Sequence, residues 1–306
     1  ATAAAVRIGD RGAKVIGGST CLEGLGWIND VLATGAGKVM DALTYHAYST
    51  DETGVFERVD ALRRICRAYN PAIRLIQGET GAQSRSDGQG ALHGAAWTPE
   101  RQAKFLARHM ISDLFQDILF ASYFSCLDMV EALNGSVDNK ASYLDYGYFG
   151  VLGADFDENG VASGEYRPKM SYRTLQVIAS IFREKFSREE FPVFFASRGS
   201  AHLLRNEDPV REVLRKCFRK PNGSCAVAYW IPKELLTTSY EGTITVETAL
   251  VEGTPRLIDV IDGTVYEIPE ANIEDNGRGV RIFRNIPLKD SPLLLTFGDF
   301  ADVEPC

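Results

Sequence analysis

The sequence lacks the features that mark membrane-spanning, metal-binding and nucleic-acid-binding proteins. No apolar run is long enough to cross a bilayer. The six cysteines have no CxxC-type spacing, and no cluster of ligand residues suggests a metal or an organic cofactor. Basic residues number 33 against 41 acidic ones, and the net charge of -8 implies no basic surface for nucleic acid or an anionic membrane. We therefore expect no cofactor, no nucleic-acid partner and no membrane span.

Internal repeats, low-complexity segments and compositional signs of disorder are also absent. The 306 residues are 45% hydrophobic and 24% charged, which is typical of a soluble globular chain of about two domains. Cys217 and Cys225 flank the turn sequence Asn222-Gly223, but a two-residue turn would not place them opposite each other, so we interpret them as free buried thiols. The chain begins at Ala1, so any signal peptide would lie upstream. The cysteines leave the compartment open, and the location is unknown, with a secreted or periplasmic one favoured over the cytoplasm.

Strand-like and helical patterns alternate through the first 188 residues. Runs typical of strands cover 14–20, 41–49, 74–82 and 119–125. Helical patterns follow them, beginning near Trp27 and Val55, at Pro99 and after Pro168. Strands that alternate with helices of this length favour a parallel sheet with right-handed crossovers. The sequence therefore predicts an α/β domain over residues 1–188.

Short alternating runs replace this pattern from residue 189 onward. They are separated by Asn-Gly, Glu-Gly, Asp-Gly and Pro turn signals. The clearest runs cover 225–231, 243–248, 256–260, 280–283 and 293–297. We predict an all-β accessory domain over residues 189–306, with a β-sandwich architecture. Such a domain could bind carbohydrate, but a role in supporting the first domain is the simpler interpretation.

Glu79 is the most informative residue of the sequence. It lies at the end of the strand-like run that begins at Arg74, directly before Thr80 and Gly81. His46 and Tyr48 end the preceding strand-like run in the same way. Barrel enzymes carry their catalytic side chains at the C-terminal ends of strands, so these three residues are candidates for a shared site. The alternatives are a solvated loop acid or helix cap for Glu79 and a buried structural histidine for His46.

The order of these motifs resembles the second half of a clan A glycoside hydrolase. The motifs are, in order, His46-Ala47-Tyr48, Gly78-Glu79-Thr80-Gly81, Tyr123-Phe124, Phe149-Gly150-Val151-Leu152 and the segment 166–172. The resemblance covers most of residues 14–186 by the order and spacing of these motifs. The β-rich remainder resembles the family only in its architecture. It implies that residues 1–188 form the last four strand-helix units of a TIM barrel, followed by a C-terminal β-sandwich. It also implies that the N-terminal half of the barrel is missing from this chain.

The resemblance further implies a retaining O-glycosidase that acts on β-linked sugars in a glycoside, an oligosaccharide or a polysaccharide. Glu79 matches the nucleophile of the family. The general acid/base of these enzymes belongs to an Asn-Glu pair that would lie upstream of Ala1, so the isolated chain is expected to be inactive. The Asn206-Glu207 pair precedes Asp208-Pro209, and we interpret it as a helix start rather than a catalytic pair.

The resemblance also implies supporting roles for other residues. Tyr48 would donate a hydrogen bond that keeps Glu79 ionised, and His46 would orient the substrate. Aromatic rings stack on sugar faces while carboxylates accept sugar hydroxyls. The expected substrate contacts are Tyr123, Trp97, Glu23 and Asp128.

Two other functions fit the same sequence. A catalytically inactive sugar-binding or structural protein could keep the cleft without turnover, and a barrel enzyme of different chemistry could use Glu79 as a base. Four strands of an eight-stranded barrel would also leave two unpaired edges and an uncovered apolar face. We therefore expect the isolated chain to be poorly soluble or to self-associate.

Overall fold

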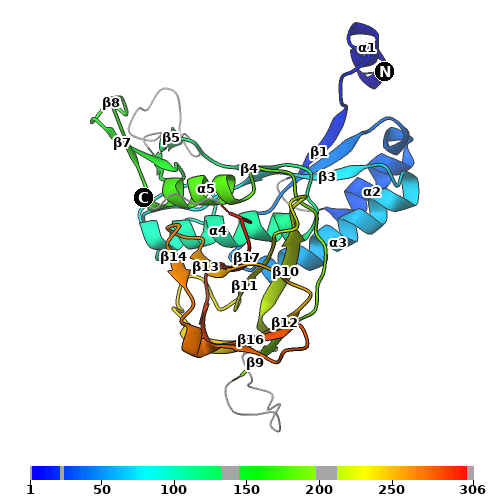
Figure 1. The fold of residues 1–306 in the computed structure, drawn as a ribbon. Coiled ribbons are helices and arrows are strands. Elements are labelled where there is room, and N and C mark those ends of the chain that lie inside the picture. Colours follow the sequence, from blue (N-terminus) through cyan, green and yellow to red (C-terminus); the bar gives the residue numbers. More distant parts are fainter. Residues whose placement is uncertain (1, 21–23, 132–144, 198–211, 302–306) are drawn as a thin grey trace. The chain divides into compact units, whose positions relative to one another are not determined.

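The structure is a computed structural model that describes residues 2–20, 24–131, 145–197 and 212–301. It is a mixed α/β structure in which the chain splits into two compact units (Figure 1). The first unit comprises residues 1–96 and 112–166, and the second comprises 97–111 and 167–306. The division at residue 188 that the sequence suggests stays a prediction.

The first unit is built on a four-stranded parallel sheet in the order β1-β2-β3-β4. Its strands are β1 (Ile16–Thr20), β2 (Ala42–His46), β3 (Arg74–Thr80) and β4 (Ala121–Tyr123). Helix α1 (Thr2–Gly9) precedes the sheet, α2 (Leu25–Ala33) and the short η1 (Ala36–Lys38) connect β1 to β2, and α3 (Glu52–Tyr69) connects β2 to β3. Because neighbouring strands run in the same direction, the C-terminal ends of all four lie at one edge of the sheet.

Helix α3 shows how the local sequence fixes this arrangement. Asp51 caps its N-terminus, since the carboxylate accepts hydrogen bonds from the amides of Thr53 and Gly54. An apolar stripe at helical spacing packs into the same core as residues of β2 and β3, including Leu43, Tyr45 and Leu75. The stripe consists of Val55, Val59, Leu62 and Cys66. Burial of each large apolar side chain stabilises the unit by about 1.5–3 kcal/mol.

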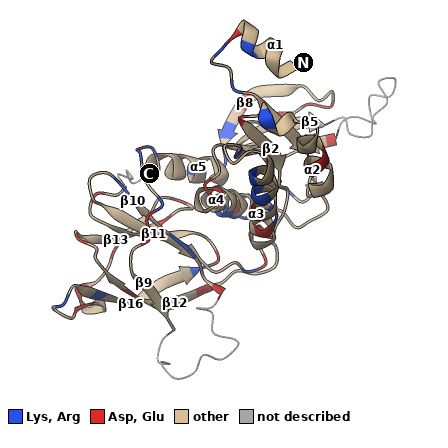
Figure 2. Cartoon of the chain, turned by 90° about the vertical axis from the view of Figure 1, so that its right-hand side faces the viewer, with Lys and Arg blue, Asp and Glu red and all other residues tan. Residues whose placement is uncertain are grey.

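Two further sheets have two strands each. Strand β5 (Met129–Glu131) pairs antiparallel with β6 (Asp145–Gly147), and β7 (Leu152–Phe156) pairs with β8 (Ala162–Pro168). Lys and Arg residues are interspersed with Asp and Glu residues along the chain (Figure 2). Within the described residues, no helix is both long enough and apolar enough to cross a membrane.

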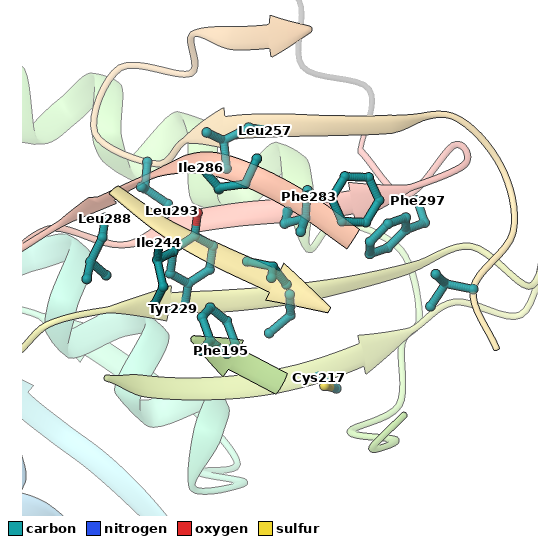
Figure 3. Packing of buried hydrophobic residues seen from close by; sticks show 14 of the residues in the cluster. Phe195, Cys217, Tyr229, Ile244, Leu257, Phe283, Ile286, Leu288, Leu293 and Phe297 are labelled. Atoms are coloured by element: carbon teal, nitrogen blue, oxygen red, sulfur yellow. The ribbon is translucent and has the colours of Figure 1, made fainter. Parts of the chain in front are cut away.

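The second unit contains two antiparallel sheets that share one apolar core. The five-stranded sheet has the order β10-β11-β17-β13-β14, with β10 (Leu214–Arg219), β11 (Cys225–Trp230), β17 (Leu293–Phe297), β13 (Pro255–Asp259) and β14 (Val265–Glu267). The four-stranded sheet has the order β15-β16-β12-β9, with β15 (Ile273–Asp275) after η4 (Glu270–Asn272), β16 (Val280–Lys289), β12 (Glu241–Ala249) and β9 (Val193–Ala196). Side chains of both sheets, among them Phe195, Tyr229 and Phe283, meet in this core (Figure 3).

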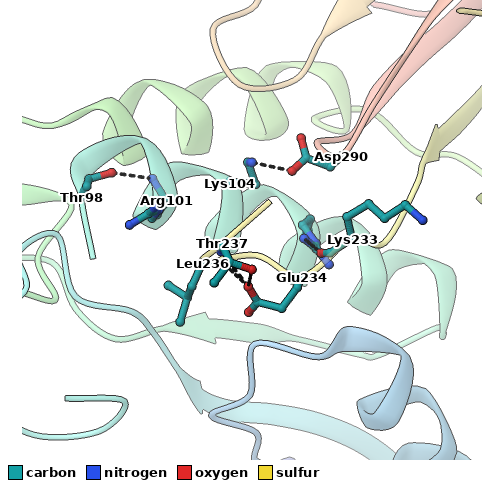
Figure 4. Close-up of polar contacts among 9 residues, drawn as sticks. Thr98, Arg101, Lys104, Lys233, Glu234, Leu236, Thr237 and Asp290 are labelled. Atoms are coloured by element: carbon teal, nitrogen blue, oxygen red, sulfur yellow. Dashed lines mark hydrogen bonds and ion pairs between the residues drawn. The ribbon is translucent and has the colours of Figure 1, made fainter. Parts of the chain in front are cut away.

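The second unit also contains helix α5 (Met170–Ile181) and the part of helix α4 (Pro99–Phe115) that ends at Ile111. The Lys104 ammonium lies 2.6 Å from a carboxylate oxygen of Asp290, and both side chains are largely buried (Figure 4). Arg108 donates a hydrogen bond of 2.8 Å to the carbonyl oxygen of Lys233. These polar contacts fix α4 to the β-rich part of its own unit.

The β10–β11 hairpin differs from the prediction in its turn. The loop has three residues, Pro221 to Gly223, and Gly223 adopts a positive φ of 89° that suits glycine. Cys217 therefore pairs with Val227 and Cys225 with Arg219, one residue away from the register of a two-residue turn. Both thiols are free and buried, and burial raises the pKa of Cys217 to about 12. Cys66 is also free and buried, whereas Cys126 is free and exposed.

Candidate functional site

Three polar side chains meet where β2 and β3 end. The Tyr48 hydroxyl donates a hydrogen bond of 2.7 Å to Glu79 Oε1. His46 Nδ1 lies 3.8 Å from the other carboxylate oxygen, Oε2. The Glu79 side chain keeps 37% of its surface exposed and the His46 side chain 18%. The carboxylate is therefore held from the β2 side, and the Glu79 side chain remains partly exposed.

An irregular register brings these residues together. The parallel pairing of β2 and β3 runs regularly up to Tyr45 opposite Gln77, and then shifts so that His46 lies opposite Glu79. Gly78 is the extra residue at this bulge. An added Cβ on Gly78 would lie 2.0 Å from Thr44 Oγ1 and 3.3 Å from His46 Nε2, so the position accepts no side chain. Bulges of this kind re-aim side chains beside active sites.

Replacing Gly78 with alanine is expected to lower the free energy of unfolding by about 1–3 kcal/mol, because the new methyl group must displace Thr44 and His46. Urea denaturation measures the change. Gly26→Ala in α2 is the matched control: no atom lies within 4 Å of its added Cβ, and the same substitution should stabilise the helix by up to about 1 kcal/mol. Equal effects of the two substitutions would show that the bulge has room for a side chain.

The end of β4 lies next to β3, the strand that carries Glu79. Tyr123 is opposite Thr80 in the β3–β4 pairing, and its hydroxyl accepts a hydrogen bond of 3.4 Å from the amide of Ala82. A Cβ on Gly81 would lie 1.8 Å from the carbonyl oxygen of Phe124, so glycine is required for the close approach of the two strand ends. The structure thus brings Tyr123 to the sheet edge that carries Glu79, with its side chain half-buried.

Aromatic and polar residues after β3 and around β6 form the surroundings of this edge. The Tyr48 ring contacts Phe149 edge to face at a centroid distance of 6.4 Å. Gln83 is fully buried and accepts a hydrogen bond of 2.8 Å from the amide of Tyr148, which ties the segment after β3 to the segment after β6. The Arg85 guanidinium lies over the Tyr148 ring, 4.2 Å from its centroid. The sequence contained no signal for Gln83 or Tyr148, because their contacts join distant segments.

Arg85 also forms a two-pronged ion pair with Asp87. Its Nε and Nη2 atoms lie 3.0 and 2.6 Å from the two oxygens of the carboxylate. Hydrogen bonding from Arg85 holds the pKa of Asp87 below its ordinary value, while desolvation raises the pKa of Tyr148. The same guanidinium therefore contacts both the Asp87 carboxylate and the Tyr148 ring. It thereby orders the loop that follows the Glu79 strand.

The structure places Trp97 and Asp128 in buried surroundings. Trp97 is 3% exposed and packs edge to face on Phe105, so its ring offers no open face to a sugar. Asp128 is buried, and its two oxygens accept hydrogen bonds from the amides of Gly150 (3.0 Å) and Ala154 (3.3 Å). It therefore anchors the segment that contains Phe149. Glu23 and the Asn206-Glu207 pair lie outside the described residues.

Within the part of the chain that the structure describes, no group of three or more His, Cys, Asp or Glu side chains could hold a metal ion. The polar groups around Glu79 are a phenol and an imidazole. A carboxylate with one strong hydrogen bond and an open side can act as a nucleophile, as a general base or as an acceptor for ligand hydroxyls.

No protein-family model and no curated protein sequence matches the chain. Among solved structures, similarity is found with glycoside hydrolases, the class of enzyme that the sequence resembles. The catalytic domain of the GH30 xylanase C from Talaromyces cellulolyticus matches over 96% of this chain and 54% of its own, with 12% identity and a TM-score of 0.49. A family 39 glycoside hydrolase from Bacteroides cellulosilyticus matches over 95% of this chain and 66% of its own, with 14% identity and a TM-score of 0.35.

A β-glucuronidase from Bacteroides uniformis matches over 89% of this chain and 26% of its own, with 16% identity and a TM-score of 0.34. The chain therefore spans about half the length of the xylanase domain, and 66% and 26% of the other two proteins. At these identities and TM-scores the likeness carries no argument about function. A function has to be derived from the geometry of the Glu79 site itself.

Proposed function

We propose that this chain carries the nucleophile of a retaining O-glycoside hydrolase for β-linked sugars, and that the nucleophile is Glu79. The observation that supports the proposal is the convergence on one half-exposed carboxylate of the Tyr48 hydroxyl at 2.7 Å and the His46 imidazole at 3.8 Å. The Tyr48 hydrogen bond fixes the orientation of the carboxylate, and an oriented carboxylate oxygen is the group that attacks the sugar in this mechanism. The exposed side of the carboxylate leaves room for an anomeric carbon.

The proposed reaction proceeds in two displacements. In the first, a Glu79 oxygen forms a bond to the anomeric carbon while the bond from that carbon to the leaving oxygen breaks, and a second carboxyl group protonates the leaving oxygen. In the second, the second carboxylate removes a proton from water, and the water oxygen displaces Glu79 from the sugar. The polar contacts of Glu79 within the described residues are with Tyr48 and His46, and neither is a carboxyl group. We propose that the acid/base comes from a segment outside the 306 residues.

The fold gives this proposal a structural frame. We propose that β1 to β4 correspond to the last four strands of an eight-stranded barrel, and that the two antiparallel sheets of the second unit form an accessory β-sandwich. In such a barrel, the C-terminal strand ends form the mouth of the active site. Glu79, His46, Tyr48 and Tyr123 all lie at that end of their strands. Tyr123 and Tyr48 offer aromatic rings for contact with the substrate.

Covalent labelling tests the nucleophile without requiring the second carboxyl group. A 2,4-dinitrophenyl 2-deoxy-2-fluoro-β-glycoside has a leaving group that departs without protonation, and its fluorine slows hydrolysis of the ester that forms. Incubation with a panel of such β-xylosides, β-glucosides and β-galactosides, followed by mass spectrometry of peptides, should place one sugar on Glu79. Labelling of another residue would contradict the assignment. Sugar binding by calorimetry with no label would favour an inactive sugar-binding protein instead.

Replacing Tyr48 with phenylalanine is expected to slow the labelling of Glu79 by about 10- to 100-fold. The reason is that a hydrogen bond to a charged group contributes about 1.5–3 kcal/mol, and phenylalanine removes it while keeping the ring on Phe149. The rate constant for inactivation by the fluoro-sugar is the measurement. Tyr69→Phe is the matched control, because that hydroxyl bonds to Asn29 on the exposed surface of α2 and α3. An unchanged rate in Tyr48→Phe would remove this hydroxyl from the mechanism.

A further inference from the structure

The peptide groups of Ala47 are held by two side chains of β3. The Ala47 amide donates a hydrogen bond of 3.3 Å to Gln77 Oε1. The Thr80 hydroxyl donates a hydrogen bond of 2.7 Å to the Ala47 carbonyl oxygen. Gln77, Thr80 and Ala47 are all buried. Strand β2 ends at His46, so these side chains supply the partners that the strand pairing no longer provides beyond that residue.

The position of Ala47 makes this arrangement relevant to the site. Its two chain neighbours are His46 and Tyr48, the residues that approach the two oxygens of Glu79. Gln77 and Thr80 stand on either side of Gly78 and Glu79. The strand that presents the carboxylate thus also fixes the backbone between the two side chains that contact it.

Thr80 links a third strand to the same point. Its carbonyl oxygen accepts a hydrogen bond of 2.7 Å from the amide of Phe124, which directly follows β4. One residue therefore joins the ends of β2 and β4 to β3, through its side chain on one side and its backbone on the other.

We infer that Gln77 and Thr80 are positioning residues of the Glu79 site. By holding both peptide groups of Ala47, they set the distances from the Tyr48 hydroxyl and the His46 ring to the carboxylate. A hydrogen bond of 2.7 Å tolerates a displacement of only about 0.5 Å before it weakens, so fixing the intervening peptide has a direct effect on it. The effect of this positioning on catalysis rests on the proposed function. The effect on the contacts of Tyr48 and His46 with Glu79 does not depend on it.

Two substitutions at one position separate the hydroxyl from the rest of the side chain. Thr80→Val keeps the shape and removes the donor to the Ala47 carbonyl, while Thr80→Ser keeps the donor and removes a methyl group. A chain labelled with 3-fluorotyrosine reports the Tyr48 environment by ¹⁹F NMR, with Tyr48→Phe identifying the resonance. In the wild-type background, Glu79→Gln should shift this resonance, since it changes the acceptor of the hydroxyl.

We expect this response to Glu79→Gln to persist in the Thr80→Ser background and to be lost or halved in the Thr80→Val background. The rate of Glu79 labelling should fall about 10- to 100-fold in Thr80→Val and stay within about threefold of wild type in Thr80→Ser. Thermal unfolding measured alongside reports the structural cost. If Thr80→Val lowered only the melting temperature and kept both the ¹⁹F response and the labelling rate, the positioning role would be wrong.

The outcomes also separate this inference from the proposed function. A wild-type chain that takes no label, but loses the ¹⁹F response in Thr80→Val, would overturn the glycosidase proposal and keep the positioning role. A wild-type chain that is labelled, with equal labelling rates in both Thr80 variants, would keep the glycosidase proposal and overturn the positioning role. If Thr80→Val does not fold, Gln77→Leu removes the acceptor for the Ala47 amide and is measured by the same two readouts, with the same expected losses.

Discussion

Replacing Glu79 with glutamine is expected to abolish sugar labelling of this chain and to slow its reaction with an activated glycoside by at least about 10⁴-fold. Glutamine keeps the shape of the side chain and can still accept the Tyr48 hydrogen bond. It is uncharged, however, and its amide oxygen is a poor nucleophile. The loss should therefore appear in the first chemical step, with sugar binding largely retained. Single-turnover kinetics with an activated glycoside is the measurement.

Glu57→Gln provides the matched control for this experiment. Glu57 is exposed on α3, and the substitution changes the net charge of the chain by the same amount. Normal labelling of Glu57→Gln together with none in Glu79→Gln would assign the chemistry to one carboxylate. Appreciable turnover in Glu79→Gln would mean that the Glu79 carboxylate only accepts hydrogen bonds from the ligand, or that it is a general base whose role another group can take over.

The largest effect on stability is expected from Lys104→Met, which should lower the free energy of unfolding of the second unit by about 3–5 kcal/mol. The Lys104 and Asp290 side chains are 16% and 5% exposed, and their charged atoms are 2.6 Å apart. Methionine keeps most of the apolar stem but leaves the Asp290 carboxylate buried without its counter-charge. A shift of the urea midpoint, followed by tryptophan fluorescence, measures the loss.

Two controls identify the cause of that loss. Lys233→Met removes an amine that pairs with Glu212 where the side chains are 32% and 49% exposed, and an exposed pair of this kind contributes at most about 1 kcal/mol. The double variant Lys104→Met/Asp290→Leu removes both charges and should recover much of the stability, because the uncompensated carboxylate is gone. A double variant as unstable as Lys104→Met would point to lost packing rather than to the charge.

The grouping of Glu79, His46 and Tyr48 could be predicted from the sequence because it depends on local patterns. A strand-like run that stops in Glu79, and another that stops at His46 and Tyr48, need only a parallel sheet to come together. The alternation of strands with helices indicated such a sheet. The three residues therefore could be grouped before any coordinates were known. The exact distances could not, because they depend on the register shift at Gly78.

Residues whose environment is set by distant segments could not be assigned in this way. Trp97 precedes a helix, and the sequence does not indicate that its ring is enclosed by packing on Phe105. Asp128 follows a strand, but the amides that occupy its carboxylate belong to Gly150 and Ala154, more than twenty residues later. In the β10–β11 hairpin, the Asn-Gly pair fits both a two-residue and a three-residue loop. The length of the loop determines which residues of the two strands pair, so the sequence did not determine the pairing.

The bridging role of Thr80 has a consequence for how this region loses its structure. The ends of β2, β3 and β4 are connected through one residue, so a fluctuation that detaches it releases both neighbours of the carboxylate in the same event. Partial loosening, in which one flank stays ordered while the other frays, is disfavoured. Such a region behaves as a single cooperative element that is either assembled or open.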